Sequence, residues 1–444
     1  MSMITQNKRQ VTVLLCLGIF LFFYSCFCTG ENFRPDGAPV KQANAEYLVK
    51  LIEHEKFPDK PEKPSDPIWA LLLEYSPDAY FLARRTEELP DTIKIGTSFT
   101  STKTSSSGTR TTTGSDGKTT ETILDGSGLK RWIQTDKSFF EQVKDISTAV
   151  HEENHEFTNT SALYLLSRKV RSEREMSVYS SDGTRSFILY LDAFYLDRNN
   201  TIYAPRRSLT HLQYPAFGAG KLEILIPEEL RTFRYKTYIN KESHHSCQQS
   251  GISGLLDEYN SYYWSNKVIF DLFEYYKTIN PQSAKTWLDW TGEVLGHYFA
   301  WAEFRYWILT YILYAEKFEP KIYASIMEDR LMRNAFTVID DRFTGLVNKL
   351  FLRLGKELPE LLVNYGIKIT VGEGITTMNG KKTESLRYQF GAVSQGMYSH
   401  FYTPLVDAMN TPQYTAAGNT FRLTPQGPLP GLDTFMKLIQ ESKK

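Results

Sequence analysis

The chain has 444 residues, of which 51 are basic and 51 are acidic, so its formal net charge is zero. This balance argues against a nucleic-acid-binding protein, because such proteins carry an excess of positive charge. Aromatic residues make up 14% of the chain, with 27 Tyr and 27 Phe. They supply enough apolar volume for a large core, in one large domain or in two to three smaller ones.

The first 28 residues have the features of an export signal. Lys8 and Arg9 precede an uncharged, mostly apolar run over residues 11–28, and this order of segments is typical of a signal peptide. Ser25 before Cys26 offers a site for lipid attachment after cleavage, and an uncleaved run of this length can act as a membrane anchor. We therefore expect the rest of the chain to lie outside the cytoplasm, either secreted or anchored to a membrane.

Cysteine usage gives no disulfide framework. Three of the four cysteines lie in the apolar N-terminal run, and only Cys247 follows it. A single remaining cysteine cannot form an internal disulfide in the mature chain. We expect Cys247 to be a small buried residue, and a role as a metal ligand is the weaker alternative.

Changes in composition divide the chain into four predicted parts. Residues 1–28 are the signal peptide or membrane anchor, and residues 29–67 contain a Pro-rich, charged run that is typical of a tether or lead-in loop. Residues 68–315 carry the motifs described below. Residues 316–444 are predicted to be helical at first and then mixed, with strand-like stretches and Gly/Pro turns.

Residues 98–123 form an insertion dominated by Ser, Thr and Gly. Alternation such as Thr-Ser-Thr predicts extended strands, and Ser-Asp-Gly-Lys predicts a turn between two of them. We expect a hairpin or loop just before the next helix. It would be either a flap over a cleft or a disordered insertion.

Residues 136–157 are predicted to form a helix. Asp136 is the expected N-cap, and no Gly or Pro interrupts the run. Five apolar residues recur at the helical period: Phe139, Val143, Ile146, Val150 and Phe157. One side of this helix is therefore expected to pack on a core.

The end of this helix reads HEENH, which fits the H-E-x-x-H pattern of zinc-dependent peptidases. His151 and His155 are one helical turn apart, so both imidazoles can reach one metal ion. Glu152 then lies beside the open position of the metal, where it can take a proton from a water molecule. An exposed charged helix whose histidines have no role is the alternative.

A catalytic zinc ion usually takes three protein ligands. The extended three-histidine pattern fails here, because Thr158 and Ser161 stand where it requires Gly and His. The best candidate for the third ligand is Glu258, at the border of the apolar stripe of a predicted helix over residues 250–267, because an acid there needs a cationic or metal partner. Asp257 is predicted to point to the far side, as a partner of a ligand or as a helix-start charge. Two solvated acids at the start of an amphipathic helix are the alternative.

Two further side chains are candidates for stabilising a negatively charged oxygen in a transition state. Tyr262 follows Glu258 by one turn on the same side of the predicted helix. His245, or its neighbour His244, lies in the loop just before that helix. An exposed loop histidine without a role is the alternative.

The segments between and after these motifs complete the prediction. Residues 186–204 read as strands, one of which is expected to form an edge beside the metal-binding helix, where an extended substrate can add. Residues 262–360 are predicted to be helical and aromatic. Their most apolar segment is interrupted by His297, Glu303 and Arg305, so we expect a buried core helix instead of a membrane span.

On HEENH and the DEYNSYY segment, the chain resembles the zincin metallopeptidases of the gluzincin type, as an exported bacterial lipoprotein-like protein. The resemblance implies an α+β, mainly helical fold. It would have a zincin-like core, a small sheet beside the H-E-x-x-H helix and a helical C-terminal part. It also implies that His151, His155 and Glu258 bind Zn²⁺ and that Glu152 acts as the general base. The family prefers uncharged residues at the two central positions of the H-E-x-x-H motif and just after its second histidine, and this chain has Glu153, Asn154 and Glu156 there.

These patterns together predict an exported zinc metallopeptidase that hydrolyses peptide bonds of a peptide or protein substrate. Its N-terminal segment is the expected contact with the membrane, and no nucleic acid is expected as a partner. The alternative is a catalytically inactive zincin-like envelope lipoprotein with a binding or structural role. An envelope protein in which HEENH arose by chance is the third reading.

Overall fold

A computed structural model gives the structure of the chain. Besides nine short strands, it describes residues 64–88, 128–169, 217–232, 234–240, 247–248, 251–328, 330–367 and 399–423. The predicted export segment, most of the predicted tether and His245 lie outside the described residues.

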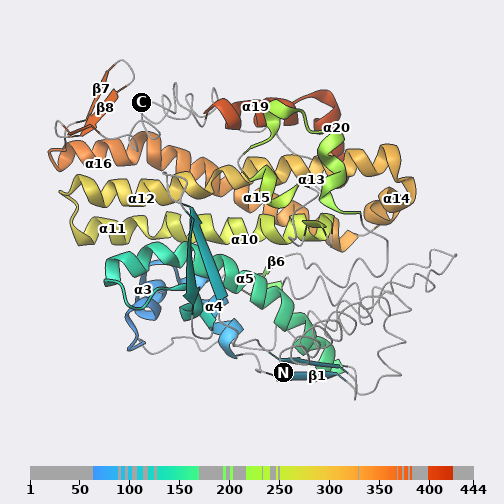
Figure 1. The fold of residues 1–444 in the computed structure, drawn as a ribbon, viewed down its shortest axis with the longest axis horizontal. Coiled ribbons are helices and arrows are strands. Elements are labelled where there is room, and N and C mark those ends of the chain that lie inside the picture. The colour runs from blue at the N-terminus through green and yellow to red at the C-terminus, as the bar shows by residue number, and fades with distance from the viewer. Residues whose placement is uncertain are drawn as a thin grey trace, which may run out of the picture.

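The centre of the molecule is a stack of antiparallel helical rods (Figure 1). Helices α10 and α11 form one rod, α12 and α13 return beside it, and α15 continues through η5 into α16 as another. Helix α14 joins α13 to α15, and α19 and α20 lie over α13. The bounds are α10 Ile252–Asp271, α11 Phe273–Ile279, α12 Ala284–His297, α13 Phe299–Phe318, α14 Pro320–Glu328, α15 Arg330–Leu352, the π-helical η5 Arg353–Glu357, α16 Leu358–Asn364, α19 Ser399–Met409 and α20 Pro412–Phe421.

Helix α5 packs along α10 on the side away from the other rods (Figure 1). Helix α4 and the short η1 cover α5 in turn, and α3 packs on α4. Because α10 has helices on both sides, nearly all of its residues are buried. The bounds of these and the remaining short helices are α3 Pro67–Tyr75, α4 Pro77–Glu88, η1 Gly128–Trp132, α5 Phe139–Lys169, η3 Ala219–Ile224, η4 Glu228–Leu230 and α8 Tyr235–Tyr238.

The expected small sheet beside the metal-binding helix is not seen, so the α+β prediction is wrong and the described structure is mainly helical. Helices α10 and α4 pack on α5 instead. Strand β1 contacts α5 but pairs only with β2. The strands are β1 Thr92–Ile95, β2 Phe99–Thr102, β3 Gly108–Thr113, β4 Thr119–Leu124, β5 Phe194–Leu196, β6 Thr201–Tyr203, β7 Ile369–Gly372, β8 Ile375–Met378 and β9 Lys381–Lys382.

Strands are found in several segments whose sequence predicts them, although the predicted sheet beside α5 is not. Strands β3 and β4 pair antiparallel from Gly108↔Leu124 to Thr113↔Thr119, which confirms a hairpin within residues 98–123. Strands β7, β8 and β9 form a three-stranded antiparallel unit where the sequence is strand-like. Strands β5 and β6, in the segment predicted to supply a substrate-binding edge, pair with each other.

The helix that carries HEENH has a capping side chain directly before its first residue. Helix α5 begins at Phe139, so the predicted cap Asp136 is wrong. A turn closed by the Lys137 amide holds Asp136 outside the helix, and the Ser138 hydroxyl accepts from the amide of Glu141 at 3.4 Å.

Helix α10 begins after Gly251, whose φ is +53°. A Cβ at this position would lie 2.6 Å from the carbonyl oxygen of Phe217 and would also clash with the Tyr311 hydroxyl. Only glycine fits both the dihedral angle and the space. Gly251 therefore fixes the direction in which α10 enters the core.

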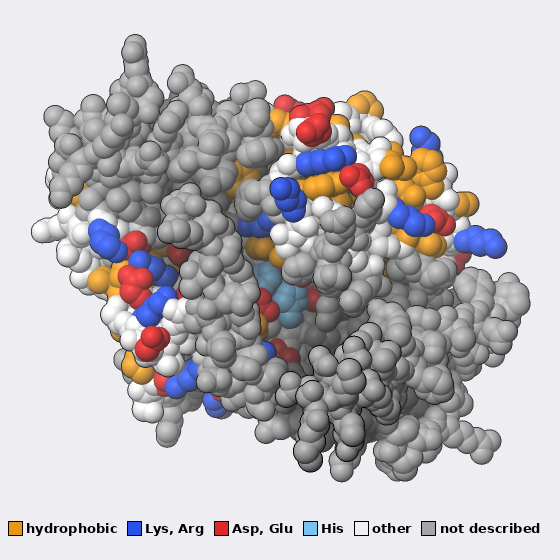
Figure 2. Space-filling view, viewed as in Figure 1, with side chains coloured by type: hydrophobic (Ala, Val, Ile, Leu, Met, Phe, Trp, Pro, Cys, Tyr) orange, Lys and Arg blue, Asp and Glu red, His pale blue; other side chains and the backbone are white. Residues whose placement is uncertain are grey.

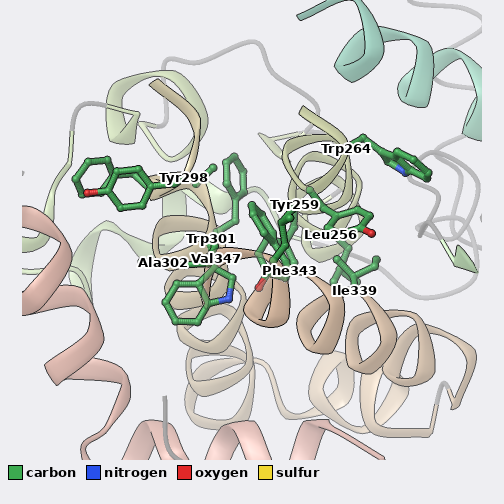
Figure 3. Packing of buried hydrophobic residues seen from close by; sticks show 14 of the residues in the cluster. Leu256, Tyr259, Trp264, Tyr298, Trp301, Ala302, Ile339, Phe343 and Val347 are labelled. Carbon is green, nitrogen blue, oxygen red and sulfur yellow. The ribbon is translucent and has the colours of Figure 1, made fainter. Parts of the chain in front are cut away.

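The core between the rods is built largely from aromatic side chains. Figure 3 shows Tyr259, Trp301 and Phe343 from three different helices packed together. Five of the seven tryptophans are less than 2% exposed: Trp264, Trp287, Trp290, Trp301 and Trp307. This dense packing is the main apolar contribution to stability.

Helix α13 is buried over almost its whole length, which confirms the prediction of a core helix. Its two interrupting charges are also buried, Glu303 being 0% and Arg305 1% exposed. No helix in the described part of the chain is both long and apolar enough to span a bilayer.

Asp340 on α15 is the centre of a second buried network of charged side chains, away from the HEENH motif. Its Oδ1 accepts from Arg305 Nε at 2.8 Å and from the Tyr259 hydroxyl at 2.8 Å. Its Oδ2 accepts from Arg422, which also contacts Asp341. One carboxylate thus joins α10, α13, α15 and the end of α20.

We predict that Asp340→Ala lowers the free energy of unfolding by about 3–5 kcal/mol, because it removes the buried carboxylate that Arg305 and Arg422 share. Urea unfolding followed by circular dichroism measures the loss. The matched control is Asp341→Ala, since Asp341 also contacts Arg422 but has a side chain that is 61% exposed. That change should cost about 1 kcal/mol or less, and equal losses in both variants would contradict the prediction.

Candidate metal centre

Three side chains from α5 and α10 converge on one point between these helices. His151 and His155 lie one turn apart on α5, and Glu258 faces them from α10. Their ligand atoms all lie within 4.8 Å of one another. The residues that sequence analysis assigned as metal ligands are therefore brought together, although about 100 positions separate Glu258 from the pentad.

The distances between the ligand atoms are short. The two Nε2 atoms of His151 and His155 are 3.1 Å apart, and each is 3.5 Å from Oε2 of Glu258. Two imidazole nitrogens at this separation repel each other unless a proton or a cation lies between them. A buried group of two histidines and one carboxylate with this spacing can bind a metal ion.

Each histidine is oriented by a second contact on its other ring nitrogen. Nδ1 of His155 lies 2.8 Å from Oδ2 of Asp257, and Nδ1 of His151 lies 3.3 Å from the hydroxyl of Ser265. An Nδ1–H that donates to these oxygens leaves the Nε2 lone pair directed at the metal position. Metal-binding histidines in proteins are held in this way, and the carboxylate partner also increases ligand basicity.

Asp257 does not point away from the histidines, so this part of the sequence prediction is wrong. Its side chain is 1% exposed and faces α5, as does that of Glu258. Consecutive residues of a helix differ by about 100° in direction, and the wide contact between α10 and α5 takes in both. The alternative role given to Asp257, as the partner of a ligand, is the one that its geometry fits.

A ladder of small polar side chains holds the two helices in register. Asn154 Nδ2 donates to the Ser261 hydroxyl at 2.7 Å, and Asn260 Nδ2 donates to Asn154 Oδ1 at 2.9 Å. One turn away, the Ser265 hydroxyl donates to the Ser147 carbonyl oxygen at 3.2 Å. Buried polar groups that are matched in this way specify one register of the pair.

The charges at this centre favour cation binding. Burial alone would lower the pKa of His155, but the carboxylates of Asp257 and Glu258 outweigh it and hold that pKa well above its usual range. Burial likewise opposes ionisation of Glu258, yet His155 and His151 hold the pKa of its carboxyl well below its usual range. The carboxylate is therefore ionised at neutral pH, and His155 retains a proton until a metal ion displaces it.

Two other predicted site residues, Glu152 and Tyr262, lie on α5 and α10 respectively. Glu152 is half-buried and follows His151 on α5. Tyr262 lies on α10 with its ring 4.6 Å from that of His151. Its hydroxyl is 3.0 Å from that of Tyr238 and accepts from Nε of Arg234 at 3.2 Å.

Tyr238 and Arg234 were missed by sequence analysis. They lie in and just before the short helix α8, and they reach the centre only because this segment folds against α10 and α13. No motif or periodicity in the sequence marks them. Cys247 is buried, as predicted, and is not among the ligands brought together.

The centre opens on the molecular surface. Figure 2 shows histidine side chains at the floor of a hollow, with acidic side chains beside them and basic side chains at its rim. The side chain of His155 is 20% exposed, which agrees with this view. The imidazole of His155 is therefore partly accessible to solvent.

Comparisons with models of known protein families, with curated proteins and with solved structures find no match for this chain.

We predict that Asp257→Asn weakens metal binding by about 10–100-fold, because an amide supports the His155 imidazole less well than a carboxylate does. Competition with a chromophoric chelator measures the dissociation constant. Asp271→Asn is the control, since Asp271 ends the same helix and pairs with Lys267 instead of a histidine. A loss of affinity in the control alone, or in neither variant, would argue against this role of Asp257.

Metal affinity should also rise with pH. Since the carboxylates raise the pKa of His155, the metal-free protein is protonated there at neutral pH, and binding must release that proton. Calorimetry in buffers of different ionisation enthalpy should show release of about one proton per metal ion at neutral pH. Above the raised pKa the release should disappear and the affinity should level off, whereas a flat affinity from about pH 6 to about pH 9 would contradict this assignment.

Proposed function

We propose that the protein is a zinc-dependent hydrolase that cleaves peptide bonds. The observation that carries the proposal is the spacing of the three ligand atoms, 3.1, 3.5 and 3.5 Å. Ligands about 2.1 Å from a tetrahedral zinc ion lie about 3.4 Å apart. Two imidazoles with one carboxylate are typical zinc ligands, whereas calcium and magnesium prefer oxygen ligands alone. Three protein ligands leave the fourth position to water or substrate.

A bound zinc ion polarises a carbonyl oxygen and brings the pKa of a water molecule towards neutrality. Glu152 directly follows His151 on α5 and is half-buried, and we assign it as the general base of the proposed reaction. In the proposed reaction Glu152 takes a proton from the attacking water and then passes it to the leaving amine. Asp257 holds His155 in the tautomer that keeps Nε2 on the metal side.

The helical fold supports a different mode of substrate binding from the one predicted from the sequence. With helices along α5, the predicted addition of an extended peptide to an edge strand beside the metal is not supported. The substrate instead enters the hollow above the histidines (Figure 2). We further propose that the enzyme acts outside the cytoplasm, because the charged and then apolar N-terminal segment is typical of an export signal.

The test is Glu152→Gln in the zinc-loaded protein. We predict that kcat towards a mixture of unstructured peptides falls by about 10²–10⁴-fold, because an amide cannot accept the proton from water. Zinc content, measured by atomic absorption, should stay at one ion per chain, since Glu152 is not a ligand. Cleavage followed by mass spectrometry gives the rate.

Glu156→Gln is the matched control, because Glu156 lies one turn further along α5 and is also half-buried. It should retain both zinc and activity. If the wild-type protein binds zinc but cleaves no peptide, the inactive zincin-like binding protein replaces the enzyme. If it binds no metal, the centre has a structural role only.

A further inference from the structure

Helices α3, α4 and α5, with the short η1, form a layer on one side of α10, while the other helical rods lie on its opposite side (Figure 1). Within this N-terminal layer, α4 and η1 pack on α5, and α3 packs on α4. Leu82 of α4, Leu129 of η1 and Val150 of α5 are each 0% exposed. The layer is therefore a packed unit, and it meets the helical body, α10 to α16, chiefly along α10.

The boundary between α5 and α10 is crossed by polar contacts. The side of α10 that faces α5 carries Asp257, Ser261 and Ser265 at intervals of four residues. Asp257 lies 2.8 Å from His155, and Ser261 accepts from Asn154 at 2.7 Å. The Ser265 hydroxyl donates to a carbonyl oxygen of α5 at 3.2 Å. Water can replace such partners when two polar faces separate, so each of these hydrogen bonds adds only modestly to the free energy that holds the layer in place.

Two ion pairs at the edges of the boundary add to these contacts. Lys144 of α5 pairs with Asp289 of α12 at 3.2 Å, and Asp78 of α4 pairs with Lys267 of α10 at 3.5 Å. The four side chains are between 19% and 27% exposed. Ion pairs that solvent reaches contribute little to stability, so they hold the layer only weakly.

Aromatic rings reinforce the boundary at the start of α5, where the layer meets α11. The ring centres of Phe140 and Tyr276 are 5.8 Å apart, and those of Tyr75 and Tyr275 are 5.5 Å apart. His155 follows Phe140 by four helical turns, so the metal position lies about 22 Å further along α5. The two ends of the boundary are thus held by different means, aromatic packing at one end and polar groups at the other.

We propose that a bound metal ion fastens the N-terminal layer to the helical body, and that in the metal-free chain the layer opens at the metal end while the aromatic contacts at the start of α5 persist. The ligands lie on both sides of the boundary, His151 and His155 on α5 and Glu258 on α10. An ion that needs all three binds the closed form, and it lowers the population of the open form about 1,000-fold when the free ion is at about 1,000 times its dissociation constant.

Opening also explains how the ion enters. Glu258 is 6% exposed, so the open form gives the ion a route to its third ligand. The inference rests on the metal position of the proposed function and does not depend on peptide cleavage.

The test measures alkylation of a thiol placed in the boundary of the full chain. Ser147 is 3% exposed, and its hydroxyl donates to Glu293 of α12 at 3.1 Å. In Ser147→Cys, iodoacetamide reaches the thiol from the open form, so the rate follows the population of that form. We expect the rate to fall about 10-fold for each 10-fold rise in free zinc above the dissociation constant. Mass spectrometry of the digested chain gives the rate for each cysteine.

Cys247, which precedes α10 in the chain and is 0% exposed, is the control within the same molecule. Its alkylation should change by less than about twofold across the zinc series, because opening of one layer leaves the rest folded. Equal slowing at both thiols means that zinc stabilises the whole fold, and this result overturns the inference. Limited proteolysis of the wild-type chain is a second measurement, and cleavage within α5 should slow with zinc to the same extent as alkylation does.

A change at the third ligand shows whether the link across the boundary is the cause. When Glu258→Gln is combined with Ser147→Cys, alkylation should stay near the zinc-free rate at zinc concentrations that protect the parent, because the ion keeps only its ligands on α5. Full protection in this double variant overturns the inference.

The outcomes separate this inference from the proposed function. Zinc-dependent protection of the boundary thiol supports the inference even if no peptide is cleaved, and Glu152→Gln should keep that protection. Alkylation that does not respond to zinc overturns the inference even if peptides are cleaved. A chain that takes up no zinc overturns both.

Discussion

The contact between Asp257 and His155 is the interaction on which the site depends, because it links the two helices that supply the ligands. At 2.8 Å it fixes the imidazole, and it does so from the residue next to Glu258. The ladder of Asn and Ser side chains continues the same interface with hydrogen bonds instead of apolar contacts. An interface that is polar at its centre is costly unless every group is matched. The matched groups favour the observed register of the two helices, and in that register the three ligand atoms meet.

The packing of the remaining helices offsets the free-energy cost of burying these polar groups. Helices α13 and α15 bury the other side of α10 in an aromatic core, while α4 covers α5. The apolar area buried there offsets the desolvation of the polar groups. Glu258 and Tyr259 illustrate the division, since one faces the histidines and the next is bonded to Asp340 in the core. A single helix thus carries the ligand and its structural support on different faces.

Local patterns in the sequence were enough to predict both helices and the convergence of His151, His155 and Glu258. The helical period and the H-E-x-x-H spacing are properties of one segment, and an acid at the edge of an apolar stripe is costly wherever it lies. The sheet was predicted from the strand-like residues 186–204 and from the resemblance, whereas in the described structure β5 and β6 of that segment pair with each other. The direction of Asp257 and the approach of Arg234 depend on how segments far apart in the chain pack together. No periodicity records such contacts.

The network around Asp340 has a consequence for synthesis on the ribosome. Tyr259 precedes Asp340 by 81 residues, and Arg422 follows it by 82. Helix α10 is therefore synthesised long before Arg422, which pairs with Asp340. Until then Asp340 has fewer of its cationic partners, and the aromatic face of α10 lacks part of its cover. The nascent chain consequently has an extended period in which this apolar surface is open to chaperones.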